Sequence, residues 1–252
     1  MSNRTSAKGA VALVSGANRG IGAAFVGGLL EAGALRVYAA ARDPQTLTAL
    51  AQSDARIIPI ALDITDDTSV QAAAARLIDV DLVVNNAGVL RGGRLIAAPD
   101  LTAARQEMEV NYFGLLRMSR AFAPILAANG GGTLINVLSI LARMANPAGG
   151  GYSASKAAAL SLTQAVRAEL LPQGTRVIGV LPGFVDTAMA EGVSAPKIQP
   201  SEVVRATLDA LLTDQDDVYP GEQASQIAAW LLQDPKAVER LFAQPSDDGK
   251  AQ

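Results

Sequence analysis

The chain has 252 residues and a formal net charge of −3, half of its residues are hydrophobic, and it contains neither cysteine nor histidine. The missing cysteine excludes disulfides, a thiol nucleophile and thiolate metal sites, and the missing histidine excludes a Ser-His-Asp triad and imidazole ligands for zinc. Acid–base chemistry must therefore use Tyr, Lys, Asp or Glu, while the slight acidity and the interspersed charges argue against nucleic acid as a partner.

Apolar runs of strand length alternate with helical patterns along the chain. Most runs are continuous, as in parallel strands that are buried on both faces. The predicted strands are Ala10–Ser15, Arg36–Ala41, Arg56–Ala61, Asp81–Asn85, Thr133–Leu138 and Thr175–Leu181. The predicted helices are Ile21–Ala32, Gln45–Ala51, Asp67–Ile78, Thr102–Ala128, Ser153–Leu171 and one near Ser201–Leu212, which precedes a weak strand near Val218.

Repeated β-α-β units of this kind predict an α/β fold, a Rossmann-type doubly wound parallel sheet with helices on both faces. Asp43-Pro44 and Asp234-Pro235 each predict a helix start, with aspartate as the N-cap and proline in the first position. The length suits a single domain over residues 1–252. No window approaches the ~18 uninterrupted apolar residues of a membrane-spanning helix, so we expect a soluble, cytoplasmic protein with no membrane partner.

The segment from Ser15 to Gly22 joins the first predicted strand to the first predicted helix. Its glycines have the spacing G-x-x-x-G-x-G, a variant of the dinucleotide-binding pattern. Such a loop lets the backbone approach a pyrophosphate and leaves N–H groups at a helix start free for the anion. An ordinary glycine-rich turn is the alternative, and a Walker A loop is excluded because no Gly-Lys-Ser/Thr follows. The expected cofactor contacts here are Ser15, Gly16, Asn18, Arg19, Gly20, Ile21 and Gly22.

The end of the second predicted strand indicates which dinucleotide binds. An acidic residue there would accept a hydrogen bond from the ribose 2′-OH of NAD, whereas an arginine accommodates the 2′-phosphate of NADP. Ala41 occupies the acidic position and Arg42 follows it, with Arg19 as a second cation that could reach the phosphate. Asp43 could bind a ribose, but its neighbour Pro44 favours helix capping. The sequence therefore favours NADP (NADPH) over NAD.

Tyr152 is the only one of the four tyrosines that has a lysine four residues later, Lys156. Residues at i and i+4 share one face of a helix. A free phenol has a pKa near ~10, and a neighbouring ammonium lowers it toward working pH. A chance pairing on an exposed helix is the alternative.

Four segments resemble the short-chain dehydrogenase/reductase family. They are the glycine loop, the run Asn85-Asn86-Ala87-Gly88, the pair Tyr152-x-x-x-Lys156 and the pair Pro182-Gly183. They occur in the expected order and at the expected intervals from about Lys8 to Asp217.

The resemblance implies four catalytic residues and no metal. Tyr152 would be the general acid in carbonyl reduction and the base in alcohol oxidation. Lys156 would lower the phenol pKa and bind the nicotinamide ribose. Ser139 would steady the substrate oxygen, and Asn111 would support a water chain to the lysine. Hydride would pass from the nicotinamide to the carbonyl carbon while Tyr152 protonates the oxygen.

The resemblance also implies further cofactor contacts. Asp63 and Ile64 would contact the adenine; the alternative, with Asp66 close by, is the first turn of the next helix. The adenosine ribose would lie against Asn86, Ala87 and Gly88, and the nicotinamide against Pro182, Gly183, Val185 and Thr187. Plain strand-end and proline–glycine turns are the alternatives for these two segments.

The sequence also departs from the family pattern. The segment 217–222 stands where many members have a final strand and a V-D-G-G-like turn that helps form a subunit interface. The usual tetramer is therefore in doubt, and a homodimer or a monomer is the alternative.

The loops Ile140–Gly150 and Thr187–Gln199 are expected to line the substrate pocket, with Leu141, Met144, Phe184 and Met189 as its apolar side chains. These residues favour a small, fairly apolar ketone, aldehyde or alcohol. The leading interpretation is an NADP(H)-dependent carbonyl reductase or secondary alcohol dehydrogenase. An NAD(H)-dependent dehydrogenase, a non-catalytic dinucleotide-binding regulator, and an epimerase or dehydratase on the same fold are the alternatives.

Overall fold

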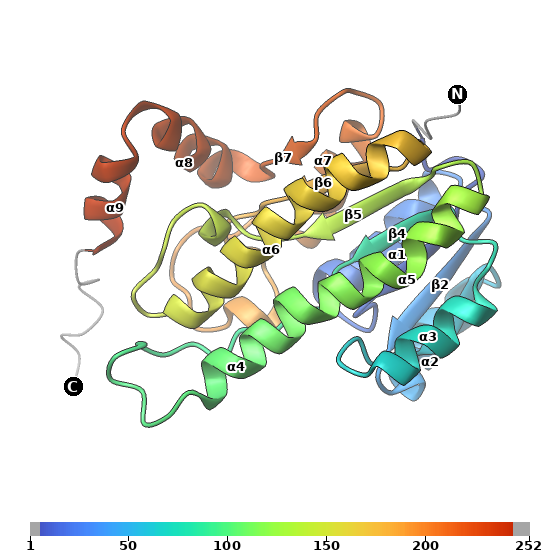
Figure 1. The fold of residues 1–252 in the computed structure, drawn as a ribbon, viewed down its shortest axis with the longest axis horizontal. Helices are drawn as coiled ribbons and strands as arrows, with labels where there is room; N and C mark the ends of the chain where they lie inside the picture. The colour runs from blue at the N-terminus through green and yellow to red at the C-terminus, as the bar shows by residue number, and fades with distance from the viewer. Residues whose placement is uncertain (1–5, 244–252) are drawn as a thin grey trace.

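A seven-stranded parallel sheet forms the centre of the computed structural model, which describes residues 6–243 (Figure 1). Its order is β3-β2-β1-β4-β5-β6-β7, so the strand order reverses between β1 and β4. The predicted doubly wound α/β fold is confirmed. The strands are β1 Val11–Ser15, β2 Arg36–Ala41, β3 Ile57–Ala61, β4 Leu82–Asn85, β5 Thr133–Val137, β6 Arg176–Val180 and β7 Asp217–Val218.

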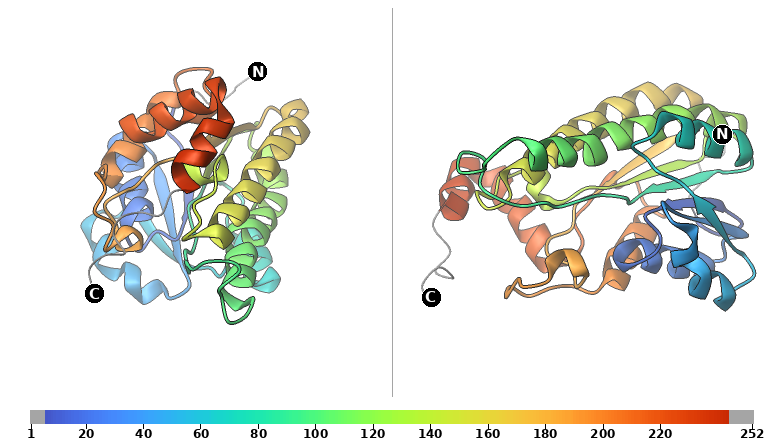
Figure 2. Two further views of the ribbon diagram at one scale, coloured as in Figure 1. Left: turned by 90° about the vertical axis from the view of Figure 1, so that its left-hand side faces the viewer. Right: turned by 90° about the horizontal axis from the view of Figure 1, so that it is seen from below.

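Helices cover both faces of this sheet. One face packs against α1, α2 and α7, and the other packs against α3, α5 and α6, with α4 beside α6 (Figure 2). The helices are α1 Gly20–Glu31, α2 Thr48–Ser53, α3 Asp67–Arg76, α4 Thr102–Met108, α5 Leu115–Ala128, α6 Gly150–Leu170, α7 Pro200–Ala210, α8 Gly221–Gln233 and α9 Pro235–Ala243. None of the helices in the described part of the chain is long and apolar enough to cross a membrane.

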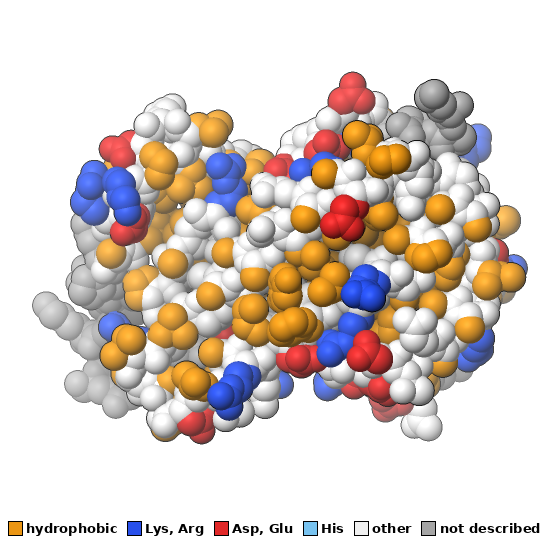
Figure 3. Space-filling model, in the orientation of Figure 1, with side chains coloured by type: hydrophobic (Ala, Val, Ile, Leu, Met, Phe, Trp, Pro, Cys, Tyr) orange, Lys and Arg blue, Asp and Glu red, His pale blue; other side chains and the backbone are white. Residues whose placement is uncertain are grey.

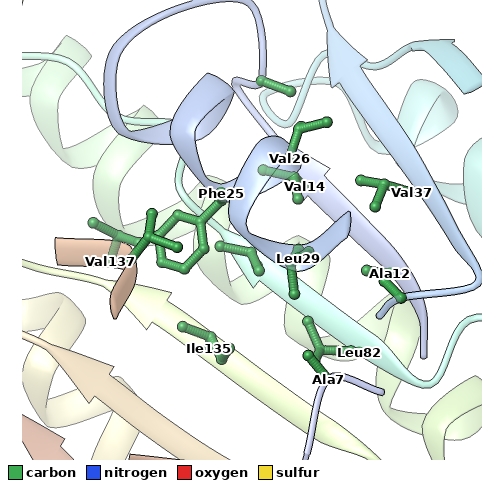
Figure 4. Close-up of a cluster of buried hydrophobic side chains, with 14 of the residues drawn as sticks. Ala7, Ala12, Val14, Phe25, Val26, Leu29, Val37, Leu82, Ile135 and Val137 are labelled. Atoms are coloured by element: carbon green, nitrogen blue, oxygen red, sulfur yellow. The ribbon is translucent and has the colours of Figure 1, made fainter. Parts of the chain in front are cut away.

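The core under α1 fixes where this helix begins. Phe25 and Leu29 are fully buried and lie against the strand residues Val14, Leu82 and Ile135 (Figure 4). Burying a side chain of this size contributes about 1.5–3 kcal/mol. This packing holds α1 against the sheet, and α1 begins at Gly20 after the loop that follows β1.

The predicted helix Thr102–Ala128 is interrupted. A π-helical segment at Glu109–Gly114 separates α4 from α5, and it contains Asn111. Such segments widen one turn of a helix and change the direction of its side chains. Gly114 allows the close approach here, because a Cβ on it would lie 2.6 Å from Cδ1 of Ile64.

Both predicted aspartate caps, Asp43 and Asp234, are present, but the helix α8 was not predicted. Asp43 accepts a hydrogen bond from the N–H of Gln45 (2.9 Å), and it begins a 3₁₀ turn at Pro44–Leu47 where the sequence predicted an α-helix. Asp234 accepts one from the N–H of Ala237 (2.9 Å) at the start of α9. The unpredicted helix is α8, which packs with α9 against residues 140–144.

Candidate active site

The candidate site lies at the carboxyl ends of the central strands, where the strand order reverses. This is the place at which doubly wound sheets bind their ligands. The segments that follow β1, β4, β5 and β6 meet here, and the strand arrowheads in Figure 1 mark this edge. The four sequence segments that resemble the family are therefore brought together.

The glycine loop and the segment after β4 are bonded into one unit. Ser15 Oγ accepts hydrogen bonds from the backbone N–H groups of Asn86 (3.0 Å) and Ala87 (3.1 Å). The side-chain amide of Asn86 donates to the carbonyl oxygens of Ser15 (3.0 Å) and Gly16 (3.1 Å). A Cβ on Gly22 would lie 2.1 Å from the Gly16 carbonyl oxygen, so only glycine fits at this close approach.

This loop leaves an open helix start. α1 begins at Gly20, and no side chain caps its first N–H groups. Gly16 and Gly20 have φ values of +63° and +55°, which favour glycine. A Cβ on Gly20 would lie 3.1 Å from the methyl group of Thr187, so the segment after β6 lies against the loop. The uncapped N–H groups and the positive end of the helix dipole fit a pyrophosphate.

Arg42 follows β2, and Arg19 precedes α1 in the glycine loop. Arg19 and Arg42 are exposed, Ala41 is buried, and the carboxylate of Asp43 caps the turn that follows. Burial favours the neutral form of Asp63, but hydrogen bonds from Thr65 and the positive charges of Arg42 and Arg117 hold its pKa below the ordinary value. Arg42 is therefore close enough to act electrostatically on the expected adenine position.

Ser139, Tyr152 and Lys156 meet in a buried cluster. Ser139 follows β5, while Tyr152 and Lys156 lie on the first turns of α6. Their exposed fractions are 8%, 8% and 5%. Lys156 Nζ lies 5.7 Å from the ring centroid of Tyr152 and donates a hydrogen bond to the Val137 carbonyl oxygen (2.9 Å).

Burial dominates the electrostatics of this cluster. The pKa of Tyr152 is raised to about 12, mainly by burial. Hydrogen bonding with Ser139 acts to lower this pKa, and the negative charge of Glu107 acts to raise it. Burial also lowers the pKa of Lys156 to about 8. The net shift of the Tyr152 pKa is therefore upward, because removal from water favours the neutral phenol.

Asn111 holds the segment after the Asn-Ala-Gly turn. Its side-chain amide donates to the Val89 carbonyl oxygen and to Ser155 Oγ (both 2.9 Å), and its oxygen accepts the Val89 N–H (2.9 Å). A Cβ on Gly88 would lie 3.1 Å from Asn111 Oδ1 and 3.5 Å from Lys156 Nζ. An adjoining pocket of about 10 Å³, with room for about one water molecule, is lined by Ser15, Ile64, Asn85, Ala87, Asn111, Leu115, Met118, Val137 and Lys156.

The expected substrate residues differ in exposure. Met144 is buried, Leu141 is half-buried, and both pack against α8 and α9, while Phe184 is half-buried and Met189 is exposed. Gln223 on α8 accepts a hydrogen bond from the Phe184 N–H (3.3 Å) and so anchors the loop after β6. Gln223 was not predicted from the sequence, because α8 was not predicted. Glu107 was not predicted either, because it is a buried residue with no flanking motif.

Comparisons with known proteins agree with this geometry. A family model described as short chain dehydrogenase matches residues 10–197. The structure is similar to that of a short chain dehydrogenase from Burkholderia cenocepacia in complex with NADP, with a TM-score of 0.91, 48% identity, and coverage of 95% of this chain and 100% of that one. An uncharacterized oxidoreductase of Staphylococcus haemolyticus is 33% identical over 82% of this chain and 93% of its own. Cis-4-hydroxycyclohexanecarboxylate dehydrogenase of Sinomonas cyclohexanicum is 33% identical over 86% of this chain and 87% of its own.

Proposed function

Because the chain belongs to the short-chain dehydrogenase/reductase family and is an oxidoreductase, we propose that it is an NADP(H)-dependent carbonyl reductase or secondary alcohol dehydrogenase. Its substrates are small, uncharged and fairly apolar ketones, aldehydes or alcohols. The observation that carries the proposal is the buried cluster of Ser139, Tyr152 and Lys156 beside the open start of α1.

The residues present fit a nicotinamide dinucleotide. The glycine loop and the first N–H groups of α1 would hold the pyrophosphate, and the ammonium of Lys156 would hold the nicotinamide ribose. Thr187 lies against Gly20 of the glycine loop, and residues 182–187 would form the wall toward the nicotinamide. When it is bound, the cofactor supplies or accepts the hydride.

Tyr152 holds the proton that carbonyl reduction needs. With a pKa of about 12, the phenol is protonated at neutral pH and can donate to the substrate oxygen. Ser139 donates a second hydrogen bond to the same oxygen, where negative charge develops during the reaction. In alcohol oxidation the phenolate of Tyr152 accepts the proton, so that direction is favoured at high pH.

Three observations favour NADP(H) over NAD(H). Arg42 and Arg19 supply two exposed guanidinium groups for a 2′-phosphate. The carboxylate of Asp43 accepts a hydrogen bond from the N–H of Gln45 and so caps the turn after β2. The Burkholderia cenocepacia protein, at 48% identity, was solved in complex with NADP.

The surface favours a homodimer over a monomer. Hydrophobic side chains gather over α4, α5 and α6 on the face seen in Figure 3. Phe113, in the π-helical segment, and Leu101, just before α4, are 44% and 58% exposed. Exposed apolar clusters of this kind mark interaction surfaces. Light scattering of the purified protein measures the oligomeric state, and a monomer or a tetramer would contradict this part of the proposal.

Turnover assays test the activity. Linear and cyclic ketones and aldehydes are assayed with NADPH or NADH. Secondary alcohols are assayed with the oxidised cofactors, NADP+ or NAD+. The relative that is named as a dehydrogenase of cis-4-hydroxycyclohexanecarboxylate makes cyclic secondary alcohols a first choice. Reduction of apolar ketones with NADPH, and much less with NADH, is the expected result. A panel on which the wild type is no faster than Tyr152→Phe would refute the proposal.

A further inference from the structure

Glu107 on α4 is a buried carboxyl group that none of the roles above uses. Its side chain is 1% exposed. None of the ion pairs found among residues 6–243 includes it. A buried carboxylate without a cation costs several kcal/mol, roughly, unless hydrogen bonds and dipoles compensate. Its neighbours therefore indicate what the residue does.

One carboxylate oxygen of Glu107 binds the segment that follows the Asn-Ala-Gly turn. Oε1 accepts hydrogen bonds from the backbone N–H groups of Arg91 (2.7 Å) and Gly92 (3.2 Å). The next residue, Gly93, donates its N–H to the carbonyl oxygen of Ala148 (2.8 Å). The bonds thus run from α4 through residues 91–93 to the chain that enters α6.

The other oxygen lies at the start of α6 itself. A Cβ on Gly151 would lie 2.3 Å from Oε2, so the carboxylate packs directly against the residue before Tyr152. The N-cap of α6, Gly149, has no side chain to cap the helix. A negative charge at an uncapped helix start is stabilising, and Figure 1 shows α4 and α6 side by side at this point.

Glu107 and Asn111 act on consecutive parts of the same segment. Asn111 is four residues further along and binds both backbone groups of Val89, while Glu107 binds the N–H groups of Arg91 and Gly92. Residues 89–92 are therefore held at both ends by side chains of one helical stretch. Leu90 completes the contact, because its Cδ1 would lie 3.8 Å from a Cβ on Gly149.

We propose that Glu107 is a positioning residue of the active site: its carboxylate fixes residues 91–92 against the first turn of α6 and so fixes Tyr152 relative to residues 89–93. The inference rests on the proposed function only in taking Tyr152 as the proton donor. It adds a residue that touches neither substrate nor cofactor, yet determines where the phenol lies.

The charge of Glu107 also acts on Tyr152. Two charged groups face the phenol, Lys156 on α6 and Glu107 on α4, and Ser139 after β5 provides the neutral partner. Burial is the main cause of the raised phenol pKa, and the charge of Glu107 adds to it. Neutralising this charge should lower the pKa of Tyr152, so that the phenolate forms at lower pH.

The test compares Glu107→Gln and Glu107→Ala with a control, Glu109→Gln, which carries the same change two residues away at a half-exposed ion pair with Arg117. In Glu107→Ala, hydrogen exchange at the amides of residues 91 and 92 should accelerate about tenfold or more, because bonds to a charged acceptor are lost. Its kcat should fall by about tenfold to a hundredfold through misplacement of Tyr152. The Kd for NADPH should stay within about twofold, because the glycine loop is untouched.

Glu107→Gln keeps an acceptor but not the charge. Its kcat should recover most of the loss, while the acidic limb of the pH profile for alcohol oxidation should move down by about 1 unit. Glu109→Gln should match the wild type in every measurement. Wild-type exchange and kcat in Glu107→Ala would overturn the proposal, and so would equal losses in both Glu107 variants without any pH shift. If the wild type reduced no carbonyl compound, the proposed function would fail, but the exchange rates would still decide the positioning role.

Discussion

Replacing Arg42 by alanine should weaken binding of NADPH and leave binding of NADH unchanged. Arg42 follows β2 directly and is exposed, and it takes part in no ion pair among the described residues. The positive charge of Arg42 lowers the pKa of Asp63, as do the hydrogen bonds from Thr65 and the charge of Arg117. Together these effects outweigh burial, which raises that pKa. The guanidinium is therefore available to a phosphate on the ribose that lies beyond β2.

The expected magnitude follows from this exposure. A hydrogen bond between charged groups contributes about 1.5–3 kcal/mol, and solvent screening at an exposed site favours the lower part of that range. The Kd for NADPH should therefore rise about 10–30-fold. NADH has no 2′-phosphate, so its Kd should change by less than about twofold. Arg42→Asp should weaken NADPH further, because it places an anion opposite the phosphate.

Calorimetric titration of both cofactors into both variants measures the effect. Added salt should reduce the difference between wild type and variant for NADPH, since the contact is exposed and ionic. Arg36→Ala is the matched control, because Arg36 begins the same strand at its opposite end and pairs with Asp79 (2.8 Å). Equal weakening of NADPH and NADH by Arg42→Ala would refute the placement of the 2′-phosphate.

Three further predictions test the site and its loop. Tyr152→Phe should lower kcat by about 10²–10⁴-fold with little change in the Kd for NADPH, because it removes only the proton donor; a comparable kcat would exclude Tyr152 from the reaction. Gly22→Ala should lower the free energy of unfolding by about 1–3 kcal/mol and impair cofactor binding, since its Cβ would lie 2.1 Å from the Gly16 carbonyl oxygen. Gly27→Ala on the same helix is the control: its Cβ would meet nothing within 4 Å, and the change should stabilise the protein by about 0.5–1 kcal/mol. Burial lowers the pKa of Lys156 from 10.5 to about 8, so the folded protein binds fewer protons than the unfolded chain between these pH values, and this group makes stability rise with pH there. Urea unfolding should therefore show wild type gaining on Lys156→Met from pH 8 to pH 10.5, and a constant difference would contradict the burial of a charged amine.

The fold could be predicted because its signals are local. Continuous apolar strands, glycines at turns, and aspartates before prolines each report on a few neighbouring residues, and their sum specifies a doubly wound sheet. The helix α8 was not predicted, because its buried residues form a core only with residues 140–144 from another part of the chain. These buried residues are Ala224, Ile227 and Ala228.

The candidate site divides in the same way. The spacing of residues in the sequence predicted the glycine loop and the pair Tyr152 and Lys156. The family resemblance added Ser139 and Asn111 as site residues. The π-helical segment around Asn111 could not be predicted from helical periodicity, because it requires the close packing of Gly114 on Ile64 from another part of the chain.

The sequence by itself determined which groups are available for chemistry: a phenol, an amine, a hydroxyl and a glycine loop, in a chain without histidine or cysteine. Only the tertiary structure decided how acidic these groups are. The pKa of Tyr152 depends on its removal from water, on its hydrogen bond with Ser139 and on Glu107, a residue of another helix. Desolvation and through-space charge act between residues far apart in the chain, and no sequence spacing encodes them.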